Sequence, residues 1–332
     1  PNLSKFEKGL GILSDEVLNR IIKFLNFPES FFEIQISNNV ENAHYRRKAS
    51  VTKTQKSAIE YSNKLIGYII DEMSASLDYP RMTIKFVNVD DGYSPEKIAW
   101  FLRRFLGIQE GDPVRDIVTL LEKNGIFVVE IDEDVDVFDG VSFLTDNGYP
   151  VIVVNKNFSN DHKRRTIAHE LGHIIMHLSK DFIFADDRNK EKEADRFANE
   201  FLMPECAIIN SLRYLKLSSL VELKRYWLVS MASIVRRAYD LKCIDKDKYT
   251  YFNRELGRKG YKKKMLLSVF VFLLKNIVCG FFNLSESEHI YDTSLYVRAN
   301  INDIKQHYLD AFYNPAIIRL YRLKEFVEGV AE

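Results

Sequence analysis

Two histidines and a glutamate in the run RRTIAHELGHIIMH, residues 164–177, have the types and spacing of a metal site. On a helix that turns by about 100° per residue, His169 and His173 lie on one side and one turn apart, so both imidazoles can bind one ion. Glu170 lies on the adjoining sector, where its carboxylate can reach a water on that ion without binding the ion itself. The spacing predicts metal-dependent hydrolysis; the alternative is an ordinary polar helix face.

A third metal ligand has to come from elsewhere in the chain, because a catalytic zinc site uses three protein ligands and leaves one position open. The run EKEADRFANEFLMP offers Glu191 and Glu193. If this run is a helix, Glu191 lies at the edge of its apolar face, whereas Glu193 points outward with Arg196 and Glu200. We therefore predict Glu191 as the third ligand. The alternative is an amphipathic helix with ordinary surface acids.

Two further polar residues lie close to these ligands in the sequence. Asp195 follows Glu191 by one turn, and we expect it to accept a hydrogen bond from the far ring nitrogen of a metal-binding histidine, which fixes the tautomer of that ring. His177 lies eight residues beyond His169, which is too far along the helix axis for shared ligation, and we expect it to interact with the helix dipole. An oxyanion-stabilising residue is also required, but with 17 tyrosines in the chain the sequence does not identify it.

The elements that must position these residues follow from the apolar pattern. Three apolar runs, GIFVVEI, DGVSFL and YPVIVVN, precede the histidines and predict strands. The pattern predicts helices around Trp100 and Leu102 and over residues 113–123, 163–178, 190–203 and 204 to about 251. The apolar residues of the histidine helix gather on its back, so we expect its polar side to face a cleft.

The N-terminal third has a different pattern. Ser14 is predicted to cap a helix that Pro28 ends. The basic run HYRRKASVTKTQK, residues 44–56, is predicted to be a solvated linker, with a phosphate-contacting arm as the alternative. A long amphipathic helix from about Ile59 is expected to follow it and to end before Pro80.

Composition restricts the class of protein. The chain has 332 residues, of which 46% are hydrophobic, so it has room for two or three domains. Basic and acidic residues balance at 47 each, so no global charge favours nucleic acid or a membrane surface.

Three cysteines without CxxC spacing disfavour a disulfide framework, and no secretory signal pattern is present, so we expect a cytoplasmic protein. Lys275 and Asn276 interrupt the apolar run 265–282, which favours a buried helix or a helix plus a strand over a membrane span.

Together, RRTIAHELGHIIMH and EKEADRFANEFLMP resemble the ImmA/IrrE family of bacterial and phage metallopeptidases. In that family a HExxH helix is followed by a glutamate helix ending in LLMP or a close variant, with the ligand glutamate thirteen residues before the proline. Glu191 stands thirteen residues before Pro204. The resemblance covers about residues 95–250. It implies an α+β fold, in which a zincin-like peptidase domain with a small sheet and a HExxH helix is flanked by helical N-terminal and C-terminal regions.

The resemblance also implies a function, that of a gluzincin-like zinc endopeptidase that makes limited cuts in a regulatory protein, typically a helix-turn-helix repressor, after stress. One zinc ion on His169, His173 and Glu191 would acidify its water and polarise the scissile carbonyl. Glu170 would take the proton from this water and deliver it to the leaving amine. Zinc is favoured over manganese or iron for this N,N,O donor set. An extended substrate could pair along the edge of the DGVSFL strand.

The competing hypothesis is an XRE-like transcriptional regulator or antitoxin that uses the peptidase-like domain as a sensor or scaffold. The run LSKFEKGLGILSDEVLNRIIKFLNFPESFF is similar to the second half of an XRE-type helix-turn-helix domain. The first helices of such a domain would precede Pro1, so we expect direct DNA binding to be weak or absent. The segment is then either truncated or a degenerate domain kept for packing or for homodimerisation.

Five segments are expected along the chain. They are a partial helix-turn-helix remnant (1–36), a basic linker with the long helix (37–94), the metallopeptidase core (95–204), its helical extension (205–262) and a C-terminal region of unknown role (263–332).

Overall fold

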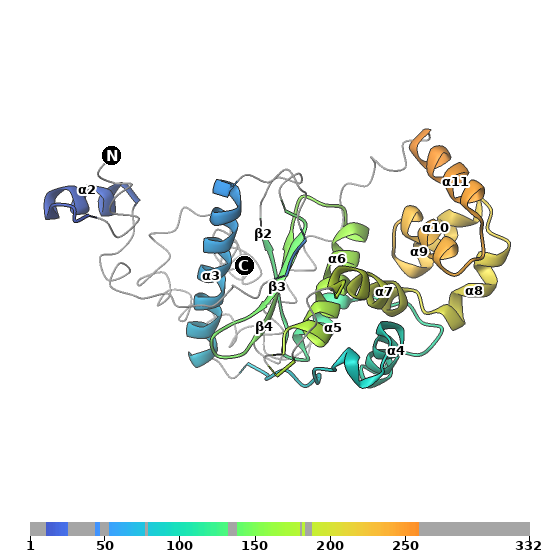
Figure 1. Cartoon of the computed structure of the whole chain (residues 1–332), viewed down its shortest axis with the longest axis horizontal. Coiled ribbons are helices and arrows are strands. Elements are labelled where there is room, and N and C mark those ends of the chain that lie inside the picture. The colour runs from blue at the N-terminus through green and yellow to red at the C-terminus, as the bar shows by residue number, and fades with distance from the viewer. Residues whose placement is uncertain are drawn as a thin grey trace, which may run out of the picture. The chain divides into compact units, whose positions relative to one another are not determined.

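The computed structural model describes residues 11–25, 44–46, 53–76, 79–131, 138–179, 181–182 and 188–258. The chain forms two compact units, one of residues 1–37 with 284–332 and the other of residues 38–283. Helix α2 (Asp15–Leu25) belongs to the first unit, and all the other described elements belong to the second. Figure 1 shows these elements in chain order. The five-segment division along the chain stays a prediction.

The N-terminal helix predicted after Ser14 is present as α2. The carbonyl of Ser14 accepts the N–H of Leu18 at 2.9 Å, which is the first helical hydrogen bond. The predicted end at Pro28 and the rest of the helix-turn-helix-like run lie outside the described residues, so that resemblance stays a prediction.

The second unit contains a four-stranded sheet in the order β1-β3-β4-β2. Its strands are β1 (His44–Arg46), β2 (Phe127–Ile131), β3 (Gly140–Leu144) and β4 (Pro150–Asn155). Strand β4 pairs in parallel with β2 and antiparallel with β3. Every residue of β4 is buried, as expected for a central strand rich in valine and isoleucine. The three predicted strands are confirmed, and so is the α+β class.

The first strand was not predicted. His44–Arg46 pairs antiparallel with β3, and Lys53 begins helix α3 (Lys53–Ser76). The prediction of a solvated linker for the basic run is therefore wrong for these residues. The reason is that the outer edge of β3 offers unpaired backbone groups, which a neighbouring segment satisfies whatever its side chains are.

The helices after α3 cover one face of the sheet. They are α4 (Pro95–Phe105), α5 (Ile117–Glu122), α6 (Asn160–His177) and α7 (Lys190–Leu202), and the short 3-10 helix η3 (Val89–Asp91) precedes α4. Helix α6 packs on β3 and β4, α7 packs on α6, and α4 packs on α7 (Figure 1). Helix α5 begins at Ile117, later than predicted, because the carboxylate of Asp116 accepts the N–H of Thr119 and caps the helix there.

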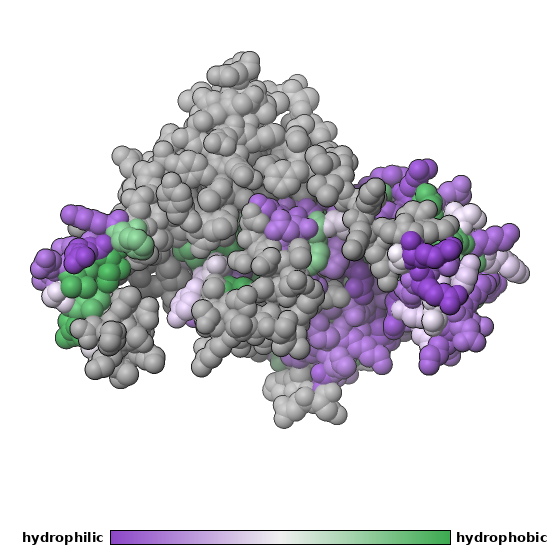
Figure 2. Space-filling view, turned by 90° about the horizontal axis from the view of Figure 1, so that it is seen from above, coloured by the Kyte–Doolittle hydropathy of each residue, from purple (hydrophilic) through white to green (hydrophobic). Residues whose placement is uncertain are grey.

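Four helices follow α7, where a helical region was predicted. They are α8 (Glu205–Arg213), α9 (Ser219–Trp227), α10 (Met231–Asp240) and α11 (Lys246–Arg258). Each contributes to the same buried apolar cluster as α4 to α7 and the sheet, so these helices share one hydrophobic core with them. The right-hand end of the view in Figure 2, where these helices lie, has a mostly hydrophilic outer surface. Among the described residues, no helix combines the length and apolar character needed to cross a membrane, and the run 265–282 lies outside them.

Glu122, at the end of α5, is a buried acid. Its Oε2 atom has no hydrogen-bond partner among the described residues. Burial raises the pKa of Glu122 well above its usual range, and the nearby charge of Asp116 adds to this shift. Because the folded-state pKa lies above the unfolded one, this carboxyl lowers stability progressively as the pH rises through that folded-state value.

We expect Glu122→Met to raise the free energy of unfolding at about pH 8 by about 1–3 kcal/mol, because it removes an unsatisfied buried group. The gain should shrink toward about pH 4.5, where the carboxyl is increasingly protonated in both states. Chemical denaturation at the two pH values measures both quantities, with Glu110→Met in an exposed loop as the control. A gain that does not depend on pH would contradict this account.

Candidate metal centre

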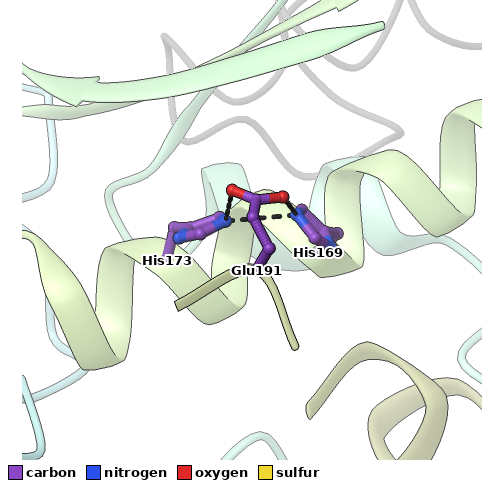
Figure 3. Close-up of side chains that lie close together, drawn as sticks. All are labelled: His169, His173 and Glu191. Carbon is purple, nitrogen blue, oxygen red and sulfur yellow. Dashed lines mark hydrogen bonds and ion pairs between the residues drawn. The ribbon is translucent and has the colours of Figure 1, made fainter. Parts of the chain in front are cut away.

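Three side chains from two helices converge on one point. His169 and His173 come from the middle of α6 and Glu191 from the first turn of α7, and their ring nitrogens and carboxylate oxygens face one another (Figure 3). The Nε2 atoms of the two histidines are 3.1 Å apart. Each of these nitrogens is also close to the Glu191 carboxylate, at 3.3 Å for His169 and 3.2 Å for His173.

These separations fit a shared ion. Ligand atoms about 2.0–2.2 Å from a tetrahedral zinc lie roughly 3.3–3.5 Å from one another. The donor set of two imidazole nitrogens and one carboxylate suits zinc and similar divalent ions. The residues present therefore fit a metal held by His169, His173 and Glu191, the three residues predicted from the sequence.

The centre is closed on the α6 side and open on the α7 side. Both histidine side chains are 1% exposed, whereas Glu191 is 54% exposed. The contacts of Glu191 with the imidazoles of His169 and His173 hold the pKa of its carboxyl well below the usual value, so it stays in the ionised form that binds metals. Glu191 is thus the ligand that solvent can reach.

Glycine brings α7 close enough to α6 for this geometry. A Cβ atom at Gly172 would lie 3.0 Å from a ring carbon of Phe197 and 3.3 Å from the Cα of Ala194. Gly172 stands directly before His173, and Ala194 follows Glu191 by one turn. The absence of a side chain at 172 therefore lets Glu191 approach the imidazoles.

Glu170 points from α6 toward β3 and is fully buried. The hydroxyl of Ser142 donates to its Oε2 at 2.7 Å, and its Oε1 has no partner among the described residues. Burial raises the pKa of Glu170, although the neighbouring His173, His169 and Ser142 act in the opposite direction. Such a carboxylate, with one oxygen held and one free to accept a proton, has the properties of a general base.

Ser142 was missed in the sequence, although a signal for it exists. Gly140 and Ser142 are two residues apart on β3 and so face the same side of the sheet, toward α6. A Cβ atom at Gly140 would clash with the methyl group of Thr166 at 2.4 Å, which shows how closely the strand lies against the helix. A small and a polar residue at alternate positions of an otherwise apolar strand would have indicated this contact.

Asp195 lies where the sequence predicts. Its Oδ1 atom is 3.0 Å from Nδ1 of His169, and the guanidinium of Arg165 donates to the same oxygen at 3.0 Å. An ionised carboxylate can only accept a hydrogen bond, so His169 donates from Nδ1 and its Nε2 is left free to bind a metal.

His177 and Glu193 differ from their predicted surroundings. Nδ1 of His177 is 3.0 Å from Nδ1 of His173, and its Nε2 is 2.9 Å from Oε2 of Glu193. The prediction that His177 interacts with the helix dipole is therefore incomplete, because His177 also contacts His173 and Glu193. The outward orientation predicted for Glu193 and Glu200 is wrong, because Glu193 faces α6 and Glu200 forms a buried ion pair with Arg237.

The polar side of α6 does not face an open cleft as predicted. His169, Glu170 and His173 are all buried, because β3 covers one side of the helix and α7 covers another. The edge of β3, which was predicted to pair with substrate, is paired with β1, with His44 opposite Ser142 and Arg46 opposite Gly140.

We expect Glu191→Gln to weaken zinc binding by more than about 100-fold, because loss of a ligand should cost more than the 10–100-fold typical of a residue that only orients one. Competition with a chelating dye measures the affinity. Lys192→Gln, at the exposed neighbouring position, should leave it unchanged. Equal affinities of the two variants would place the ion elsewhere.

Two protein-family models match parts of the chain. Residues 121–239 match the family model Peptidase_M78, described as the IrrE N-terminal-like domain. Residues 282–329 match a domain of unknown function, DUF6965, and lie outside the described residues. A search of curated proteins finds no match to the chain.

The Peptidase_M78 match includes strands β2 to β4, helices α6 and α7, and all the residues of the metal centre. The match covers 119 of the 332 residues and supports the resemblance of this segment to the ImmA/IrrE family.

Proposed function

We propose that the chain is a zinc-dependent, gluzincin-like endopeptidase that makes limited cuts in a regulatory protein of the helix-turn-helix repressor class. The observation that carries the proposal is the position of Glu170, a buried carboxylate directly beside a three-donor metal cluster. Oε1 of Glu170 has no partner among the described residues, so this oxygen is available to accept a proton beside the metal cluster. The Peptidase_M78 match supports the same reaction class.

The chemistry divides between the ion and the side chains around it. His169, His173 and Glu191 would hold a divalent ion, which would supply Lewis acidity for the scissile carbonyl and make the attacking water more acidic. Glu170 takes the proton of that water on Oε1 and later gives it to the leaving amine, for which its raised pKa is suited. Ser142 holds Oε2, so the carboxylate keeps one orientation through both transfers.

We expect Glu170→Gln to lower cleavage by about 10²–10⁴-fold, because the amide cannot accept the proton. Zinc content should stay at that of the unchanged chain, since Glu170 is not a ligand. Co-expression with candidate helix-turn-helix repressors, followed by detection of their fragments, tests cleavage, and metal analysis of the purified chain tests zinc. Glu222→Gln, at an exposed position of α9, is the control.

The same experiment separates the competing function, a regulator that uses this domain as a scaffold. That hypothesis expects no fragments from either form, together with repression that persists when Glu170 is replaced. Its support among the described residues is limited to α2, which matches one helix of the N-terminal run that resembles a helix-turn-helix.

Substrate binding is proposed to use the edge of β3 that β1 now occupies. Ser142, which holds the general base, is also the residue opposite His44 in the β1–β3 pair. An extended peptide paired with β3 would therefore lie beside Glu170, in the place that residues 44–46 take. We propose that β1 has to leave this edge before a substrate can pair there, so β1 competes with substrate.

Proline variants in β1 test this competition. Adjacent residues of an antiparallel strand alternate in donating to the ladder, so one of Tyr45→Pro and Arg46→Pro removes a hydrogen bond to β3. A net loss of about 0.5–1.5 kcal/mol should raise kcat/KM by about 2–10-fold. Tyr45→Thr, which keeps the backbone donor and suits a strand, should not change it. A fall in kcat/KM for the proline variants would instead make β1 a required part of the site.

A further inference from the structure

A chain of polar contacts extends from His173 away from the metal centre. His177 links Nδ1 of His173 to Oε2 of Glu193, with distances of 3.0 and 2.9 Å. The guanidinium of Arg188 donates to both oxygens of Glu193 at 3.1 Å and to Asp90 at 3.0 Å. We name His177, Glu193 and Arg188 the His177 relay.

The geometry allows one consistent placement of the protons. Nε2 of His173 faces Glu191 and the Nε2 of His169, so it is the nitrogen that binds a metal and must carry no proton. The proton of His173 is then on Nδ1, which donates to Nδ1 of His177. His177 accepts there, so its own proton is on Nε2, from which it donates to Glu193. A carboxylate can only accept, and it therefore fixes the direction of both hydrogen bonds.

From these contacts we propose that His177 and Glu193 are positioning residues for the metal centre, which hold His173 in its metal-binding tautomer as Asp195 holds His169. This inference rests on the metal site of the proposed function but not on proteolysis. Arg188 keeps the Glu193 carboxylate in place.

The partners of His173 are less exposed to solvent than the partner of His169. The side chain of His177 is fully buried and that of Glu193 is 17% exposed, whereas Asp195 is 42% exposed. Water can replace a lost partner of His169 more easily than a lost partner of His173. Without Glu193, nothing in the relay prevents the His177 proton from moving to Nδ1, where it would face the proton of His173. His173 would then favour protonation on Nε2, which cannot bind a metal.

Two substitutions at 177 separate the hydrogen bond from simple packing. His177→Leu removes the acceptor for His173, whereas His177→Gln keeps one in its amide oxygen. We expect His177→Leu to weaken the binding of Zn²⁺ by about 10–100-fold. The affinity of His177→Gln should be close to that of the unchanged chain. Glu193→Met should weaken binding in the same range and by more than Asp195→Asn does. Chelator competition with Zn²⁺ alone on the full chain gives these affinities.

Glu200→Gln provides the matched control, because Glu200 is also a buried carboxylate on α7 but pairs with Arg237, away from the metal centre. This variant should lower the stability of the chain and leave the affinity for Zn²⁺ unchanged.

A second readout does not depend on metal or activity. Histidine ring ¹⁵N spectra of the metal-free chain report which nitrogen carries the proton, and we expect His173 to be protonated on Nδ1 and His177 on Nε2. In Glu193→Met this preference should be lost. Protonation of His173 on Nε2 in the unchanged chain, or equal Zn²⁺ affinities for His177→Leu and the unchanged chain, would overturn the relay. Tight Zn²⁺ binding without cleavage of any substrate would remove the proposed peptidase function and leave the relay standing.

Discussion

The close contact between α6 and α7 is the constraint on which the metal centre depends. Two helices approach this closely only where no side chain separates them, and Gly172 provides that place against Ala194 and Phe197. The first turn of α7 then lies over the middle of α6. The distance from Glu191 to the two imidazoles is therefore set by backbone packing, before any ion binds.

Burying so many polar groups on one helix would be costly if they lacked partners. In α6 the partners come from three directions. Asp195 on α7 holds His169, the His177 relay holds His173, and Ser142 on β3 holds Glu170. Each group thereby keeps one orientation, which lowers the cost of arranging the site when a metal or substrate binds. Oε1 of Glu170 differs from these groups, since it is buried without a partner among the described residues.

Local periodicity was enough to predict part of this arrangement. His169, His173, Glu191 and Asp195 were found because helical spacing relates residues on one helix, and the apolar runs gave β2, β3 and β4. A helical wheel does not say which neighbour covers a given face, so Glu193 was placed in solvent although His177 and Arg188 enclose it. Strand β1 was missed for a similar reason, since its pairing comes from the open edge of β3 and not from an apolar pattern of its own.

The end of α7 is tied to distant parts of the chain by two buried arginines. Arg103 on α4 donates to the carbonyl of Phe201 at 2.7 Å, and Arg237 on α10 donates to the carbonyl of Met203 at 3.2 Å. These carbonyls lie at the C-terminal end of the helix, where no further turn can satisfy them. A fragment that stops at Pro204 would keep every metal ligand but lose Arg237, and one that starts at residue 121 would lose Arg103. The smallest unit that keeps both contacts at the end of α7 is therefore longer than the span of the metal ligands, and it has to include α4 and α10.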